Sequence, residues 1–372
     1  MRKYLFILFI SYSHFSVAQL FNDHSKLALV KRTVDYIYNV EEDSVLLYID
    51  SVELQLPNHP VVPMLRGMKI LWENIPLVTV DSIFRRFKHE MNEVIRLSGR
   101  MDGGRQEHPE AIFFEMAARG LLAEYYADDD QYMKAVSEAS KTYHLLKMGF
   151  DLQHEVPEFL FTSGLYNYFR EKYPEKYPVY RSFVWLFRSG DIEKGLEQLQ
   201  KACEVTVISR VEANVYLAYI YLRYEYKPLK AQKYLVNLQR QYPNNLYINA
   251  KLLESYADGR NFEKISLPII DRLLASDRPY YQLAGKTFQG LYQEKILKDH
   301  EAALKLYKEA ISSGSIILGH GEYYRSLTYL GMGRIYYAKG DYRNAEYHLK
   351  KSLENSPTQV IEEEVESLLE LI

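Results

Sequence analysis

The segment SLTYLGMGRIYYAKGDYRNAEYHLKKSLENSPTQ, residues 326–359, contains two amphipathic helices and the turn between them. Apolar side chains recur at helical spacing over about 322–338 and again over about 342–354. Gly340-Asp341 supplies the turn, because glycine adopts positive φ freely and an aspartate caps the helix that follows. Pro357 ends the second helix, since proline cannot continue it. The segment therefore predicts an antiparallel helical hairpin.

Small and large residues alternate in this hairpin with a fixed spacing. The small ones are Gly333, Ala345 and Ser352, and the large ones are Tyr329, Met332, Tyr336 and Leu349. This pattern resembles the tetratricopeptide repeat of about 34 residues, with Tyr for Trp, Met for Leu and Leu for Phe at the usual positions. Each such hairpin leaves an apolar face that only the next hairpin covers. The resemblance implies an all-α fold, a right-handed α-solenoid of tetratricopeptide-like hairpins.

Further copies appear in the same register at 26–59, 116–149 and 212–245. Second-helix patterns also occur around GDIEKGLEQLQKA and EAALKLYKEAI. The repeat starts are not separated by multiples of the repeat length, so we expect irregular hairpins and longer loops between them. Candidate loops are 98–109, 171–180 and 312–321, and we expect the acidic amphipathic segment 361–372 to cap the last repeat through Val365, Leu368, Leu369 and Ile372.

We expect four parts along the chain. Residues 1–18 read as a signal peptide, 19–110 as N-terminal hairpins, 111–245 as central repeats, and 246–372 as C-terminal repeats with the capping helix. The signal-peptide interpretation follows from a positive start, a short apolar run and small residues at Ser16 and Ala18. The alternative is a buried first helix. The leader predicts an exported protein, periplasmic, associated with the cell envelope or extracellular.

Residues 159–205 are similar to a block found in exported bacterial tetratricopeptide-like proteins. The matching residues are Gly164, Tyr166, Tyr168, Gly190, Asp191, Lys194, Gly195, Leu199 and Ala202. A fainter likeness connects the chain to a eukaryotic family of mitochondrial-surface tetratricopeptide-like proteins. What these resemblances imply is protein–protein interaction.

Composition excludes several classes of protein. The 372 residues are 47% hydrophobic and 26% charged, a globular balance, and the net charge of −3 gives no reason to expect nucleic acid as a partner. No segment after the leader is long and apolar enough to predict a transmembrane span. The single cysteine, Cys203, reads as a packing thiol or as one half of an intermolecular disulfide.

No motif for catalysis, cofactor binding or metal binding is complete. His89-Glu90 and His154-Glu155 lack the second histidine of a zinc-protease helix, and Gly285-Lys286-Thr287 lacks the first glycine of a phosphate-binding loop. We therefore expect no enzymatic activity, no cofactor and no metal.

A partner would contact the concave side, which the first helix of each hairpin lines. In the repeat register the inward positions are Tyr168, Phe169, Arg223, Tyr224, Arg334 and Tyr337. Tyrosine and arginine are typical of binding hot spots, although 34 tyrosines in one chain also make packing roles common. The leading hypothesis is a scaffold that binds a protein or peptide in this groove. The alternatives are a glycan- or small-ligand-binding helical protein and, least favoured, an enzyme with its site in a long loop.

Overall fold

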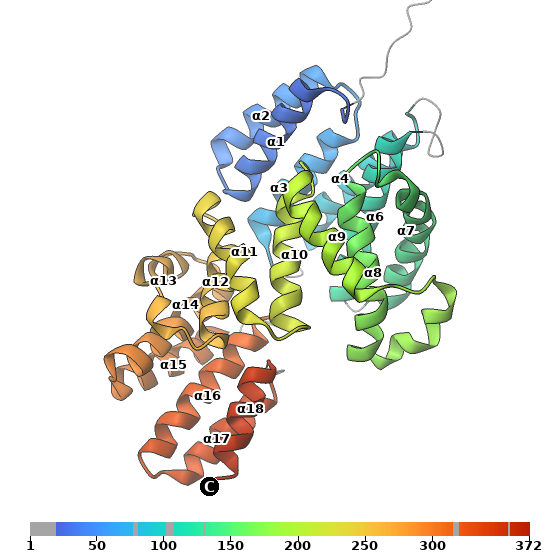
Figure 1. The fold of residues 1–372 in the computed structure, drawn as a ribbon. Helices are drawn as coiled ribbons and strands as arrows, with labels where there is room; N and C mark the ends of the chain where they lie inside the picture. The colour runs from blue at the N-terminus through green and yellow to red at the C-terminus, as the bar shows by residue number, and fades with distance from the viewer. Residues whose placement is uncertain (1–19, 77–80, 102–107, 130, 315–319, 356–357) are drawn as a thin grey trace, which may run out of the picture.

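The computed structural model describes residues 20–76, 81–101, 108–129, 131–314, 320–355 and 358–372, and these residues form helices and connecting loops without a strand (Figure 1). The helices of the first half are α1 (His24–Tyr38), α2 (Glu42–Gln55), α3 (Val61–Asn74), α4 (Asp81–Ser98), α6 (Pro109–Asp128), α7 (Tyr132–Leu152), α8 (Phe159–Lys176), the 3₁₀ helix η1 (Pro178–Leu186) and α9 (Ile192–Val205). Those of the second half are α10 (Arg210–Arg223), α11 (Pro228–Gln241), α12 (Leu246–Asp258), η2 (Phe262–Lys264), α13 (Leu267–Leu274), α14 (Pro279–Tyr292), the π-helix η3 (Gln293–Leu297), α15 (His300–Gly314), α16 (Glu322–Ala338), α17 (Tyr342–Leu353) and α18 (Gln359–Leu369).

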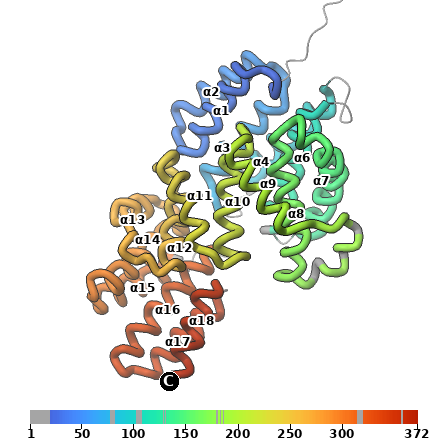
Figure 2. The backbone as a smooth tube through the Cα atoms, viewed as in Figure 1, coloured from blue at the N-terminus to red at the C-terminus, as the bar shows by residue number. Residues whose placement is uncertain are grey.

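Successive helices pack as antiparallel pairs that stack into a curved array (Figures 1 and 2). The pairs are α1–α2, α3–α4, α6–α7, α8–α9, α10–α11, α12–α13, α14–α15 and α16–α17, and α18 covers the last one. The fold is an all-α, tetratricopeptide-like solenoid, as the sequence predicts.

The C-terminal hairpin has the expected bounds. Gly340 adopts φ +74° in the turn, and the Asp341 side chain accepts a hydrogen bond from the backbone N–H of Asn344. A Cβ on Gly333 would lie 2.7 Å from the Leu349 side chain. This glycine is therefore required for the close approach of α16 and α17.

The other predicted hairpins are present as well. Residues 26–59, 116–149 and 212–245 correspond to α1–α2, α6–α7 and α10–α11. The expected loop at 171–180 is wrong in its first half, because α8 continues to Lys176 with Pro174 inside its last turn. A proline so close to the end removes only one helical hydrogen bond, so the helix tolerates it. Of the other two expected loops, 102–107 and 315–319 fall outside the described residues.

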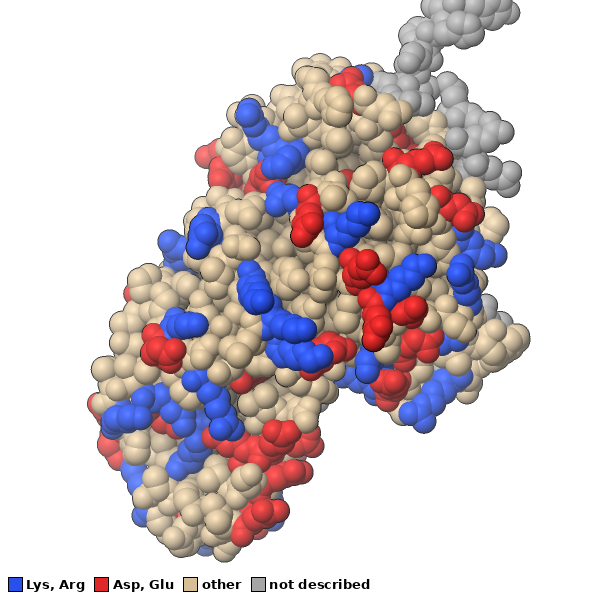
Figure 3. Space-filling view, viewed as in Figure 1, with Lys and Arg blue, Asp and Glu red and all other residues tan. Residues whose placement is uncertain are grey.

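The capping helix is only partly as expected. Ile361 and Val365 of α18 are buried against the last hairpin, and Leu368 and Leu369 pack there partly. Ile372 is 42% exposed and does not contribute to the cap, because α18 ends at Leu369 and the chain turns away. The opposite face of α18 carries exposed glutamates, which form the acidic patch at the lower end of Figure 3.

The solenoid curves far enough for distant hairpins to meet. Arg278, just before α14, donates hydrogen bonds to the carbonyl oxygens of Asn74, Ile75 and Pro76 at 2.7, 2.8 and 3.1 Å. Tyr281 donates to the same Ile75 oxygen at 2.7 Å. The end of α3 is thus fastened to α14, about two hundred residues further along the chain.

The structure describes the single cysteine but not the predicted signal peptide. The predicted signal peptide, residues 1–18, lies outside the described residues. Cys203 on α9 is a free, partly buried thiol that packs against the apolar core, and burial raises its pKa to about 12. A thiol with so high a pKa is a weak nucleophile, which agrees with the packing interpretation.

Candidate functional site

A large apolar cavity opens between helices of the N-terminal and central hairpins. Its volume is about 510 Å³, and its walls come from α3, α6, α7, α8 and α10. Methionine, phenylalanine, leucine and alanine dominate the lining, including Met68, Phe113, Met116 and Leu165. Gly120 lies on its wall, where a Cβ would meet nothing within 4 Å. Cavities of this size and composition are typical of binding sites for small molecules or apolar side chains.

The start of α10 is fixed beneath this cavity by one buried carboxylate. Glu158, at the start of α8, accepts hydrogen bonds from the backbone N–H groups of Val207, Ile208 and Ser209 at 2.6, 3.0 and 3.0 Å. Its exposed fraction is 4%. A carboxylate is favoured there because the N-terminus of a helix carries unpaired N–H groups and a partial positive charge. This contact sets the position of the first turn of α10, including Glu212.

Glu212 brings a carboxyl group to the cavity wall. Its Oε1 accepts hydrogen bonds from the Tyr38 hydroxyl at 2.5 Å and the Trp72 indole nitrogen at 3.2 Å. Within the described part of the chain no donor contacts its Oε2. Burial raises the pKa of Glu212, and the two hydrogen bonds partly oppose that shift. The residue thus offers one unsatisfied acceptor to an otherwise apolar space.

The remaining polar side chains of the lining already have partners. Thr142 and Thr162 donate to carbonyl oxygens of their own helices, and Tyr216 donates to Glu124 at 2.7 Å. Tyr143 accepts the backbone N–H of Arg188, and Tyr166 donates to its carbonyl oxygen. These groups close the cavity without adding free hydrogen-bonding capacity.

An aromatic–basic cluster adjoins the cavity on the inner face of the solenoid. We define it as Phe169, Tyr173, Lys176, Tyr177, Tyr219, Arg223 and Tyr224. The Phe169 and Tyr224 rings meet edge to face with centroids 5.3 Å apart, and Lys176 Nζ lies 4.6 Å from the Tyr224 ring centroid. Phe169 and Tyr173 line both the cavity and the cluster. The two features are therefore one continuous surface.

The cluster holds more positive than negative charge. Arg223 forms an ion pair with Glu254, whose other oxygen pairs with Lys251 at 2.9 Å. Burial and repulsion from Arg223 together lower the pKa of Lys176. Over the described residues no carboxylate forms an ion pair with Lys176, which rests on tyrosine rings instead. Cations on aromatic faces are stabilised by the ring quadrupole.

Four of the six residues expected in the groove lie near one another. One of these four, Tyr168, is buried in the core and does not face the groove. Phe169, Arg223 and Tyr224 belong to the cluster. Tyr168 is fully buried, with its ring in the core and its hydroxyl donating to Glu225 at 2.9 Å. The expectation that Tyr168 faces a partner is wrong, because the close approach of α8 and α9 turns this position inward.

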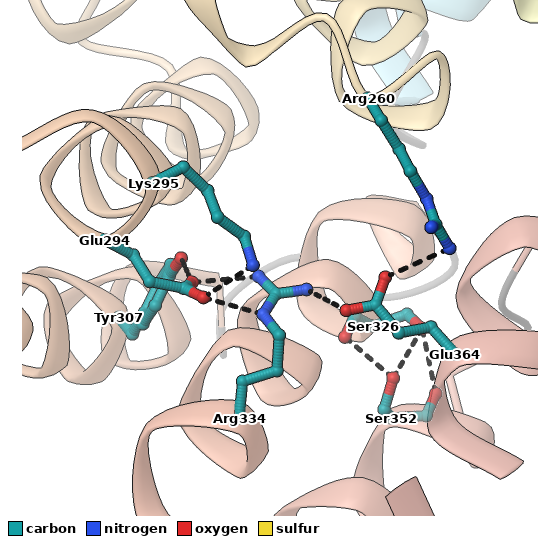
Figure 4. A network of polar contacts seen from close by, with 8 residues as sticks. All are labelled: Arg260, Glu294, Lys295, Tyr307, Ser326, Arg334, Ser352 and Glu364. Carbon is teal, nitrogen blue, oxygen red and sulfur yellow. Dashed lines mark hydrogen bonds and ion pairs between the residues drawn. The ribbon is translucent and has the colours of Figure 1, made fainter. Parts of the chain in front are cut away.

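The other two expected residues lie on α16, away from the cluster. Arg334 donates to both oxygens of Glu294 at 2.7 and 2.8 Å and to Glu364 at 3.0 Å, while Tyr307 also donates to Glu294 (Figure 4). Arg334 is therefore engaged in joining η3, α16 and α18. Tyr337 is half-buried, and its ring centroid is 5.7 Å from that of Tyr342.

Sequence reasoning missed Lys176 and Glu212. Lys176 falls in the segment expected to be a loop, so no helical register placed it beside Tyr224. Glu212 is a first-turn acidic residue of a helix, a position where glutamate is common for helix stability alone. No local sequence signal distinguishes a glutamate that only stabilises its helix from one that also lines a cavity.

Comparison with known proteins agrees with the repeat assignment. Residues 292–358 match the tetratricopeptide repeat family. The tetratricopeptide match is confined to this C-terminal segment. The match spans η3, α15, α16 and α17, and protein-interaction scaffolding is the function that tetratricopeptide repeats favour. No curated protein matches this chain significantly.

Two solved structures are distant likenesses. The human IFIT1 dimer with PPP-AAAA is 13% identical, with 96% of this chain and 97% of that chain covered and a TM-score of 0.44. A monomeric mutant of IFIT1 with m7Gppp-AAAA is 15% identical, with 95% and 78% covered and a TM-score of 0.29. Neither likeness bears on what this chain binds.

The described residues contain no helix long and apolar enough to cross a membrane. In the same residues, no group of three or more His, Cys, Asp or Glu side chains is placed to hold a metal ion.

Proposed function

We propose that this protein is a non-enzymatic scaffold that binds a protein partner through the aromatic–basic cluster on the inner face of the solenoid. The observation that supports it most is the juxtaposition of Phe169, Lys176 and Tyr224. Tyrosine, phenylalanine and basic side chains supply large contact area with polar ends, the composition of interface hot spots. Tyr177 is 38% exposed, so part of this area is open to a partner.

Export is part of the same proposal. It rests on the leader pattern of residues 1–18 alone, and places the scaffold in the periplasm, at the cell envelope or outside the cell.

A glycan-binding role is less favoured by the geometry. Sugar recognition needs many convergent hydrogen-bonding groups, whereas the polar side chains around the cavity are mostly engaged with the protein itself. The cluster offers ring faces and cations, but few free acceptors. A protein surface with apolar and acidic side chains matches it better.

Site-specific photo-crosslinking tests the proposal. A photoreactive amino acid replaces Tyr224 in one full-length variant and Tyr347 in another, since Tyr347 is 56% exposed on α17, in a second helix. We expect one recurrent protein to crosslink at position 224 in cells and not at position 347. The additional change Lys176→Glu should reduce that product. Equal labelling at both positions, or none at 224, contradicts the proposal.

A further inference from the structure

We propose that the apolar cavity is a separate binding site for a small amphiphilic amine, with an alkyl chain in the cavity and a protonated amino group at Oε2 of Glu212. This site adjoins the protein-binding cluster proposed above and shares Phe169 and Tyr173 with it, but it takes a different ligand. It uses walls from five helices, and its capacity of about 510 Å³ suits a small molecule.

The lining favours an alkyl chain over a polypeptide or a sugar. Met64, Met68 and Met116 supply unbranched, polarisable side chains that adapt to an alkyl chain. A peptide backbone placed here would bury N–H and C=O groups with few partners, because Thr142, Thr162 and Tyr216 are already hydrogen-bonded. Each unsatisfied group would cost free energy. An alkyl chain has no such groups.

Glu212 supplies the polar end of the site. Its Oε1 is occupied by the hydroxyl of Tyr38 and the indole of Trp72, both neutral donors. Its Oε2 has no hydrogen bond to the described residues, although the side chain lines the cavity. A buried carboxylate without a cationic partner is costly, and a charge-assisted hydrogen bond from an ammonium group offsets that cost.

The sign of the ligand charge follows from the other charged residues of the lining. These are Glu124 and Arg170. The Arg170 guanidinium is engaged by the Glu171 carboxylate at 3.2 Å and the Val184 carbonyl oxygen at 2.9 Å. Both terminal nitrogens of that cation are engaged, and among the charged groups of the described lining the acidic ones, Glu124 and Glu212, outnumber it. The wall therefore favours an amine over a fatty acid of the same length.

Calorimetric titration with three ligands that differ only in the polar group tests the proposal. Decylamine, decanol and decanoate are titrated into the full chain at pH 7. We expect decylamine to bind at least tenfold more tightly than the other two. Decanoate binding as tightly as decylamine, or no binding of any of the three, overturns the proposal.

The substitution Glu212→Gln tests how much the negative charge of Glu212 contributes to binding of the amine. The amide oxygen still accepts the hydrogen bonds of Tyr38 and Trp72, so the wall keeps its structure while the negative charge is lost. Decylamine should lose tenfold or more in affinity, and decanol should not change. The control is Glu193→Gln on the exposed face of α9, which should leave both ligands unaffected. An unchanged decylamine affinity in Glu212→Gln overturns the proposal.

Gly120→Leu tests the cavity without touching the carboxyl group. Nothing lies within 4 Å of a Cβ placed at Gly120, so a larger side chain begins in open space on the cavity wall. All binding should fall at least tenfold, with the helical circular dichroism and the melting temperature preserved. This variant tests the cavity even if Glu212→Gln does not fold. Decylamine binding that survives Gly120→Leu overturns the proposal. Partner crosslinking at position 224 should persist in Gly120→Leu, which distinguishes failure of this site from failure of the proposed scaffold function.

Discussion

Gly164 on α8 and Gly195 on α9 bring two helix backbones into direct contact. A Cβ at position 195 would lie 2.9 Å from the carbonyl oxygen of Gly164 and 2.7 Å from the backbone nitrogen of Tyr168. Backbone atoms cannot move aside as a flexible side chain can. This contact fixes α8, which carries Phe169 and Lys176 of the aromatic–basic cluster.

Gly195→Ala should therefore destabilise the protein by about 1–3 kcal/mol, the usual cost of overpacking a close contact. Urea unfolding followed by circular dichroism measures the change. Gly120→Ala is the matched control, because its Cβ enters open space. That helical substitution should leave stability unchanged or raise it by up to about 1 kcal/mol. Equal losses in both variants would contradict the backbone-contact argument.

Arg334→Met should cost about 3–5 kcal/mol, because it leaves Glu294 buried without its main partner. Glu294 is 5% exposed, and only the Tyr307 hydroxyl and the Lys295 ammonium group would remain as its partners among the described residues. Thermal unfolding of the full chain is the measurement. The surface pair Lys350–Glu346 on α17 supplies the control, and Lys350→Met should change stability by less than about 1 kcal/mol.

Acid should weaken the same contact in the unaltered protein. The Arg334 charge, with its hydrogen bonds and Lys295, outweighs desolvation and lowers the pKa of Glu294 from 4.5 to about 2. A lowered folded-state pKa gives stability that is complete above pH 4.5 and lost as the pH falls toward 2. The loss is on the order of 3 kcal/mol. Unfolding free energy measured from pH 6 to 2 should fall less steeply in Arg334→Met; parallel curves would exclude this pair as the cause.

Tyr168→Ala should behave as a core truncation and not as a loss of a binding contact. Its ring is fully buried, so we expect a cost of about 3–5 kcal/mol. Tyr168→Phe removes only the hydrogen bond to Glu225 and should cost about 1 kcal/mol. Partner capture by Tyr168→Phe should equal that of the unaltered chain. Capture lost in Tyr168→Phe with stability retained would restore a binding role for this tyrosine.

The leader pattern predicts cleavage after Ala18. Intact-mass measurement of the protein from its native host should give a chain that begins at Gln19. Replacing Ala18 with Asp should block cleavage, because the peptidase accepts only small residues before the cut, and Gln19→Asn serves as the neighbouring control. A native chain that retains residues 1–18 would exclude a cleaved leader.

The sequence was most informative where the structure depends on neighbouring residues. The spacing of Gly333, Ala345 and Leu349 predicts α16 and α17 almost to the residue, because the contact between two helices of one hairpin is local. The same reasoning predicts a partner-binding role for Arg223 and Tyr224, which stays a prediction. It misplaced Tyr168, because the position depends on how deeply α9 packs against α8 at Gly195.

Contacts between distant hairpins were beyond prediction from local pattern. Tyr38 and Glu212 are 174 positions apart, and their contact depends on the summed rotation of every hairpin between them. A small change in any one rotation would separate them. The apolar cavity follows from the same summed curvature, so no single segment predicts it.

The Arg278 contact with the end of α3 changes the mechanical character of the molecule. An open solenoid touches only its neighbours and stretches like a spring, with small bends distributed along its length. Here Arg278 and Tyr281 join two distant turns, so that the hairpins from α3 to α14 form a closed ring. The apolar cavity, whose walls include α3 and α10, therefore has a fixed width. A ligand that binds there must fit this width, because it cannot widen the cavity.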